Sequence, residues 1–263
     1  GGADALALLA DWDLRCEVDA VAPTLFHGWL AVFMRGMLAD DMGLVGELLF
    51  GDLPGAPSLT MANTALHWLE ATDADIDAIE SGDMPFPSVS GRNFFDDTNT
   101  EGVETRDELL LASLDQALVE LVGACPDIDA DLSACTWGRV HTLGLIDPTA
   151  AFLPGADVPA QPKPGGLNTV DAADFPLLEG GVLPAHFAVD NAPSNRFAFE
   201  LDPAGIRGAW VLPGGQSEDP ESPHHSDQFD RYMAGELVEM PLTDAEVEAA
   251  AVDTWSLEAG FGG

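Results

Sequence analysis

The densest group of chemically capable side chains lies in the polar segment at residues 213–228. Ser217 in this segment does not form a hydrolase nucleophile elbow, because that motif needs a glycine on each side of an x-Ser-x core after a strand. The glycine pair 214–215 could form a phosphate nest, but the acidic run beginning at Glu218 argues against anion binding. The sequence instead predicts a structural loop in which the glycines permit positive φ and the Gln216 side chain secures neighbouring backbone.

The histidines do not have the spacing of a metal site. His224 and His225 are adjacent, so they cannot both face one ligand from a regular element, and no Cys or His stands at a zinc-like distance from them. His141 is flanked by apolar residues and is interpreted as an interior, hydrogen-bonded histidine. The sequence reveals no partner for the other three, which are His27, His67 and His186.

Three aspartates alternate along one short segment, at Asp127, Asp129 and Asp131. The pattern is similar to the first half of a calcium loop, which continues with Gly at its sixth position and Glu at its twelfth. Here Leu132 occupies the Gly position. The two interpretations are a calcium site and an acidic loop in an acidic protein, and calorimetric titration of a metal-stripped sample distinguishes them.

Two of the three cysteines, Cys125 and Cys135, bracket the aspartate segment. A disulfide that closes this short loop would fit an oxidising compartment, and the alternative is a pair of reduced, buried thiols. Cys16 has no partner in this scheme. We expect Cys16 to be either buried or bonded to another chain.

Composition predicts a folded and strongly acidic protein. The 263 residues are 46% hydrophobic and include six Trp and 13 Phe, enough for a substantial core. The net charge of −37 arises from 46 acidic and nine basic residues, a surface that repels nucleic acid and anionic lipid. Acidic chains with so few lysines are typical of organisms that live in salt, so the composition suggests a halophilic source.

The sequence predicts neither a membrane span nor a signal peptide within this segment. No stretch approaches 18 apolar residues without charge, and no basic region precedes an apolar one near the start. If the protein is exported, upstream sequence directs the export.

Helices are expected to dominate the first half of the chain. Apolar residues recur at helical spacing over residues 4–15 and 23–42, and again around 61–70. Thr105 followed by Glu108 predicts a capping box that opens another amphipathic helix.

Turn-forming residues predict a loop at 81–100, and strand-like runs begin near Trp137. The expected strands cover 137–144, 187–189, 196–201 and 208–212, and further helices are expected at 226–233 and 243–251. The order of elements favours an α+β protein, with a mainly helical segment at 1–136 and strands and helices at 137–263.

A set of motifs extends over nearly the whole chain. They are Leu-Leu-Ala-Asp-Trp-Asp at 8–13, Trp-Gly-Arg-Val-His at 137–141, Asn-Thr-Val-Asp-Ala at 168–172, Ala-Pro-Ser-Asn-Arg at 192–196, and Pro-Gly-Gly-Gln-Ser with Ser-Pro-His-His-Ser-Asp-Gln within 213–228. In this order they resemble the penicillin acylase family of N-terminal nucleophile hydrolases, for which the last two motifs are specific.

The resemblance implies a four-layer αββα sandwich, of which this chain would form the C-terminal part in the β-chain region. Family members cleave their precursor so that a Ser becomes a new N-terminus, and its free amine activates its own hydroxyl. That Ser, the oxyanion Asn and a nearby Arg precede the matched region in the family, so none is assigned to a residue here. The nucleophile would lie on another chain, and Gly1-Gly2 would mark a second processing site or the start of the ordered C-terminal part.

The resemblance also implies the partners and the compartment. The expected partners are an upstream α chain, a nucleophile-bearing β segment and a small-molecule amide substrate. The exclusion of nucleic acid rests on the charge of the chain. No cofactor is required, although calcium could bind the assembly. The compartment would be periplasmic or extracellular.

Glu218 is the candidate catalytic residue in this chain. In the branch of the family with cephalosporin and long-chain acyl acylases, a His near the nucleophile pairs with a downstream acidic residue, and the resemblance implies Glu218 as its counterpart. The other interpretation of Glu218 is a surface carboxylate beside Asp219 and Glu221.

Two alternatives to the enzyme interpretation follow from the same residues. The chain could be a binding or assembly module of this lineage that has lost catalysis, which its charge and missing nucleophile would permit. It could also be an independent acidic α+β protein with accidental motif similarity, which would fold as a monomer without partners.

Overall fold

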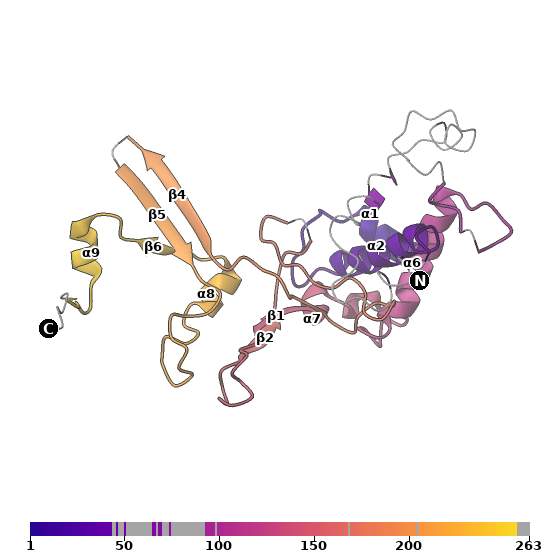
Figure 1. Cartoon of the computed structure of the whole chain (residues 1–263). Coiled ribbons are helices and arrows are strands. Elements are labelled where there is room, and N and C mark those ends of the chain that lie inside the picture. Colours follow the sequence, from indigo (N-terminus) through magenta and orange to yellow (C-terminus); the bar gives the residue numbers. More distant parts are fainter. Residues whose placement is uncertain are drawn as a thin grey trace. The chain divides into compact units, whose positions relative to one another are not determined.

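The structure is a computed structural model, and it describes residues 1–43, 46, 50, 65–66, 68–69, 74, 93–97, 99–167, 169–203 and 205–256. They belong to two units (Figure 1). Unit 1 contains Gly1–Gly144 and Pro159–Ala192, and unit 2 contains Leu145–Val158 and Pro193–Gly263. The helix predicted around 61–70, with His67, and the loop predicted at 81–100 lie mostly outside the described residues.

Three helices that pack against one another form the body of unit 1. They are α1 (Gly2–Ala10), α2 (Ala22–Leu38) and α6 (Arg106–Leu121). Helix α2 begins with a proline in its first turn, where a missing N–H costs nothing. At the start of α6 the Thr105 side chain accepts from Glu108 N, and the Glu108 carboxylate accepts from Thr105 N at 2.9 Å. The predicted capping box is therefore confirmed.

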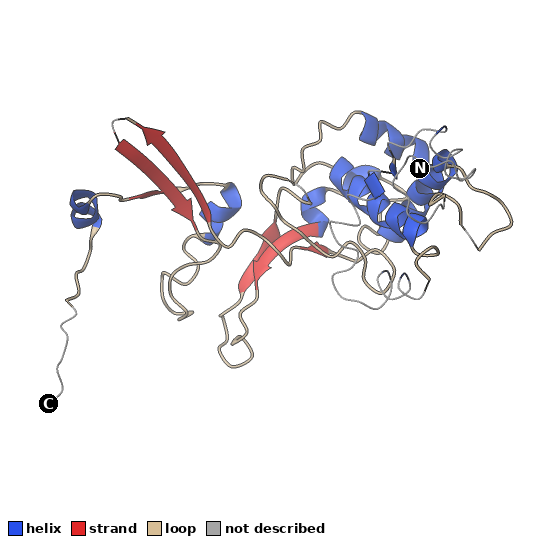
Figure 2. Ribbon diagram, turned by 45° about the horizontal axis from the view of Figure 1, so that its top comes forward, coloured by secondary structure: helices blue, strands red, loops and turns tan. Residues whose placement is uncertain are grey.

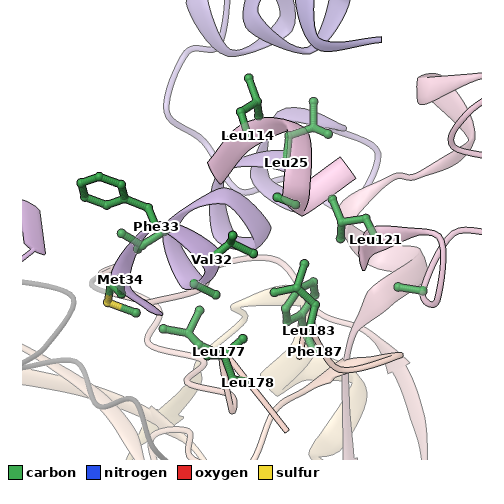
Figure 3. Packing of buried hydrophobic residues seen from close by; sticks show 14 of the residues in the cluster. Leu25, Val32, Phe33, Met34, Leu114, Leu121, Leu177, Leu178, Leu183 and Phe187 are labelled. Carbon is green, nitrogen blue, oxygen red and sulfur yellow. The ribbon is translucent and has the colours of Figure 1, made fainter. Parts of the chain in front are cut away.

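The core of unit 1 joins segments that are far apart in sequence (Figure 3). Apolar residues of α2 and α6 meet a later stretch of the chain, and the labelled residues are Leu25, Val32, Phe33, Met34, Leu114, Leu121, Leu177, Leu178, Leu183 and Phe187. An ion pair between Arg35 Nη2 and Glu120 Oε1, 2.6 Å apart, ties α2 to α6. The other oxygen of Glu120 accepts from Leu183 N at 3.0 Å, so the later stretch is fixed by a polar contact as well.

A small sheet in the order β2-β1-β3 follows the helices. Its strands are β1 (His141–Leu145), β2 (Val158–Pro162) and β3 (Phe187–Ala188), and β1 and β3 run parallel. The prediction of a strand over 137–144 is wrong in its first half, because Trp137–Val140 forms the short helix α7. The N–H groups of Trp137 and Gly138 donate to Ala20 O and Val18 O, both at 2.7 Å, which holds this turn against the segment before α2.

Unit 2 is built around an antiparallel sheet in the order β4-β5-β6 (Figure 2). The elements are β4 (Arg196–Asp202), β5 (Gly205–Val211), α8 (Phe229–Ala234), β6 (Val238–Met240) and α9 (Asp244–Ala250). Helix α8 ends at Gly235, whose φ of 72° suits a left-handed C-cap. The strands and helices predicted for this part of the chain are confirmed, with shifted ends, and β6 was not predicted.

A disulfide joins Cys125 and Cys135, with 5.5 Å between their Cα atoms, as one of the two sequence interpretations predicted. Cys16 is a free thiol whose pKa is raised to about 11, first by burial and then by the charge of Glu17. None of the described helices has the length and apolar character needed to cross a membrane.

Candidate functional site

The segment predicted to be a structural loop, residues 213–228, closes on itself through backbone hydrogen bonds. Gln216 N and Ser217 N both donate to His224 O, at 2.9 and 3.1 Å, and Gln228 N donates to Gly214 O at 3.1 Å. The side chain that secures neighbouring backbone is Gln228, whose Oε1 accepts from Leu212 N at 3.0 Å. The prediction that Gln216 has this role is therefore wrong. Among the residues that the structure describes, Gln228 has it.

Neither of the two glycines of this loop is required for positive φ, and only Gly215 is required for space. Neither Gly214 nor Gly215 is among the described glycines with positive φ, which corrects the sequence interpretation. A Cβ at Gly215 would lie 2.0 Å from His224 O, far inside van der Waals contact. A Cβ at Gly214 would meet Leu145 Cδ1 at 3.4 Å, an ordinary contact. The close approach of two backbone segments thus explains one glycine of the pair.

The two adjacent histidines of the loop have different surroundings. His225 is partly buried, with Nδ1 3.1 Å from Ser217 O and Nε2 2.9 Å from Ala156 O. The exposed His224 contacts the Asp227 carboxylate at 2.9 Å. Because both ring nitrogens of His225 face backbone carbonyls, this histidine is not placed as a base for a side-chain hydroxyl.

Glu218 lies exposed in the loop, and it makes no hydrogen bond or ion pair with any residue that the structure describes. The hydroxyl of Ser217 accepts from Asp219 N at 3.2 Å, and Asp219 Oδ1 accepts from Glu221 N at 3.0 Å. These local turns occupy the side chains on either side of Glu218. Its carboxylate therefore remains open to a group from outside the described chain.

A buried cluster in unit 1 has Trp137 at its centre. The indole is stacked between His27 and His141, with ring centroids 4.7 and 4.2 Å apart, and Phe175 packs edge-on against all three rings. Trp137 Nε1 donates to Gly165 O at 2.7 Å, which satisfies its polar group. The cluster fixes α2, α7 and the turn after β2 to one another.

Both histidines of this cluster have a lowered pKa, about 4 in each case. Burial is the main cause for both, and hydrogen bonds to backbone carbonyls oppose it only in part. His141 Nδ1 lies 2.5 Å from Lys163 O and Nε2 lies 3.2 Å from Ala173 O. A neutral ring donates from one nitrogen only, so we assign the proton to Nδ1, which makes the shorter contact. The interpretation of His141 as an interior, hydrogen-bonded histidine is confirmed.

The sequence interpretation missed a buried cation next to His141. Lys163 is fully buried, and its Nζ donates to Pro164 O at 2.9 Å and pairs with the Asp171 carboxylate. Its backbone N–H donates to His141 O at 3.0 Å. A buried ammonium needs such partners because desolvation is costly. The only sequence signal was that Lys163 is the single lysine of the chain, placed between two prolines.

The three aspartates of the calcium interpretation, Asp127, Asp129 and Asp131, are exposed. Asp131 Oδ1 accepts from Ser133 N at 2.9 Å and from Ser133 Oγ at 2.6 Å, which begins the 3-10 helix Leu132–Ala134 and lowers the Asp131 pKa. Across the ranges described, no group of three or more His, Cys, Asp or Glu residues is arranged to hold a metal ion.

Comparisons with known proteins agree on one family. The model of the penicillin amidase family matches residues 1–249. The chain is 23% identical over 239 residues to the acyl-homoserine lactone acylase QuiP of Pseudomonas putida, a match that covers 91% of this chain and 26% of that protein. Its fold resembles a thermostable penicillin G acylase from Alcaligenes faecalis with a TM-score of 0.58 at 17% identity, covering 100% of this chain and 44% of that one. The chain thus spans about a quarter of the curated relative and less than half of the solved chain.

Proposed function

This chain belongs to the penicillin amidase family, and from that premise we propose that it is the C-terminal portion of an amidohydrolase of the penicillin acylase type. The complete enzyme hydrolyses the carbon–nitrogen bond of an acyl amide through an acyl-enzyme on an N-terminal Ser. That Ser lies on another chain of the same precursor, which autoproteolysis releases. In this proposal the chain contributes helices and strands to a four-layer αββα body.

The observation that carries the proposal is the family match over residues 1–249, which includes the loop at 213–228. Two further features are consistent with a supporting role for this chain. In the loop, Ser217 Oγ accepts from Asp219 N, and neither ring nitrogen of His225 contacts that hydroxyl. The exposed carboxylate of Glu218 is available to a histidine from another chain.

A periplasmic or extracellular location is part of the proposal. The disulfide between Cys125 and Cys135 supports it, because such bonds persist in oxidising compartments. The charge of −37 supports the halophilic source that we propose for the enzyme.

The test uses the complete protein expressed from its whole gene. The N-termini of its mature chains are sequenced, and hydrolysis is measured on chromogenic amides with short, aromatic and long acyl groups. We expect a chain that begins with Ser and turnover of at least one acyl class. A variant with that Ser replaced by Ala is expected to remain unprocessed and inactive. An unprocessed protein that hydrolyses none of the amides would refute the enzyme and favour a non-catalytic assembly module of the same lineage.

A further inference from the structure

The sheet of unit 2 has one apolar face. Residues directly opposite one another in antiparallel strands share a face, as do alternate residues along a strand. The register pairs Phe197 with Trp210, Phe199 with Gly208 and Leu201 with Ile206, and it continues from β5 to β6. One face therefore carries Phe197, Phe199, Leu201, Ile206, Gly208, Trp210, Val238 and Met240, and we call it the apolar sheet face.

The side chains of this face are largely exposed. Phe197, Leu201 and Ile206 have relative exposures of 62%, 79% and 58%. The opposite face is mixed: it carries an ion pair of 2.6 Å between Arg207 and Glu200, and also Ala198, Ala209 and the buried Val211. An exposed apolar surface of this kind in a highly charged protein marks an interaction site.

Unit 2 buries little apolar surface of its own. Among its described residues, the buried apolar side chains are Ala156, Val211, Phe229 and Tyr232. A small sheet becomes independently stable only when it has a hydrophobic face to bury or a helix packed against it. In the described part of unit 2, Leu242 packs against the apolar sheet face at Gly208, while Phe197, Leu201 and Ile206 stay largely exposed.

A notch of about 370 Å³ adjoins the apolar sheet face, lined by Trp210, Val238, Asp227, Gln228 and Arg231. The first two belong to the face by register. The side chain of Arg231 is exposed and makes no hydrogen bond or ion pair with the residues that the structure describes. A guanidinium in this position favours a carboxylate on whatever covers the face.

We propose that the apolar sheet face binds an apolar element from the portion of the same protein outside this chain, and that a carboxylate of that element pairs with Arg231. This inference rests on the proposed function, in which the chain is part of a longer precursor. The relatives matched here are two to four times longer than the aligned part, so such a portion is available to cover the face. The unpaired guanidinium gives the interface its charge complementarity.

The test is photo-cross-linking in the complete, mature protein. Benzoylphenylalanine replaces Phe199 on the apolar sheet face or, as the matched control, Ala198 on the opposite face of the same strand. Mass spectrometry identifies the peptides joined to each position. We expect Phe199 to cross-link to the same protein outside these 263 residues and Ala198 to give a several-fold lower yield. The cross-link at Phe199 is then measured with Arg231→Gln, which should lose most of the yield, and with Arg231→Lys, which should retain it.

Several outcomes would overturn the inference. They are cross-links from Phe199 to a second copy of this chain, equal yields from the two positions, and no protein cross-link at Phe199 in protein whose circular dichroism matches the wild type. A cross-linking yield unchanged by Arg231→Gln would show that no carboxylate of the covering element pairs with Arg231. Amide hydrolysis is measured on the same samples, so an active enzyme without the cross-link refutes this inference alone. A protein that forms the cross-link but hydrolyses no amide refutes only the proposed enzymatic function.

Discussion

The indole of Trp137 stacks on the imidazole of His141, one helical turn later, with their ring centroids 4.2 Å apart and their planes within 11°. The short helix α7 brings them together, because residues at this spacing share a helix face. His27 covers the other side of the indole. The motif at residues 137–141 is therefore the centre of a buried stack, which explains why both an aromatic residue and a histidine occur in it.

Acid should destabilise the chain through this stack. The folded-state pKa of about 4 for His27 and His141 lies below the ordinary 6.5, so the unfolded chain binds protons more readily between these values. The free energy of unfolding should fall as the pH falls from about 6.5 to about 4, by up to about 3 kcal/mol for each histidine, and this contribution should level off below that. Denaturant unfolding at several pH values measures it.

Variants of the stack test the cause. His27→Phe keeps an aromatic ring against Trp137 but cannot titrate, so the slope between pH 6.5 and 4 should become shallower. His186→Gln, at an exposed histidine, should leave the slope unchanged. An identical slope in His27→Phe and the wild type would assign the acid sensitivity to other groups.

The two glycines of the loop at 213–228 should respond differently to alanine. Gly215→Ala places a Cβ 2.0 Å from His224 O, so the backbone must move, at a cost of about 1–3 kcal/mol. Gly214→Ala meets only a leucine methyl group at 3.4 Å and should cost less than about 1 kcal/mol. Thermal unfolding of the two variants measures the difference, and equal losses would contradict the close approach at Gly215.

Removal of the disulfide should lower stability. The bond between Cys125 and Cys135 closes a loop with a sequence separation of 10, so replacing both by Ser should cost about 2–3 kcal/mol. Cys16→Ser, at a partly buried free thiol, is the control and should cost much less. Denaturant midpoints of the variants, with and without reductant, provide the measurement. Reductant that lowers the midpoint of the double variant as much as that of the wild type would point to another cause.

Glu218→Gln in the complete enzyme should slow maturation or turnover if a histidine of another chain pairs with this carboxylate. Glu221→Gln, on the same loop and also exposed, is the matched control. Precursor cleavage is followed on gels, and kcat is measured on a reactive chromogenic amide. Full maturation with unchanged kcat in Glu218→Gln would leave this residue as a surface carboxylate.

Salt should stabilise the protein. The carboxylates behind the net charge of −37 repel one another in the folded state. Salt screens this repulsion, because the Debye length shrinks from about 10 Å at 0.1 M salt to about 3 Å at 1 M. The melting temperature should therefore rise between low and molar NaCl. Calorimetry over a salt series measures the rise, and a flat response would argue against a halophilic origin of the acidity.

The sequence predicts those elements that depend on residues close to one another along the chain. Thr105 and Glu108 form the expected capping box because a cap needs only residues within one turn. Cys125 and Cys135 are close enough in sequence for their bond to be anticipated. The structure of residues 137–144 is harder to predict, because the helical turn at Trp137 depends on hydrogen bonds to the carbonyls of Val18 and Ala20. No local pattern reveals these bonds.

The candidate site depends on contacts between distant segments, and sequence alone predicts little of it. Gly215 is needed because His224 O approaches it, while its φ is not positive. Lys163 is buried because Asp171 and the Pro164 carbonyl satisfy its charge. Nothing in the residues around Lys163 indicates that these partners exist. The motifs of the sequence predict the family, whereas the contacts within the site are seen only in the structure.

The interleaving of the two units limits how this protein can be dissected. The chain leaves unit 1 after Gly144, returns at Pro159 and leaves again after Ala192, so neither unit is a continuous stretch of sequence. A truncation after Gly144 would remove Leu177, Leu178 and Phe187 from the core of unit 1. Expression of either unit as a simple fragment should therefore fail. A circular permutation or a linker that bridges residues 144 and 159 would be needed to obtain unit 1 alone.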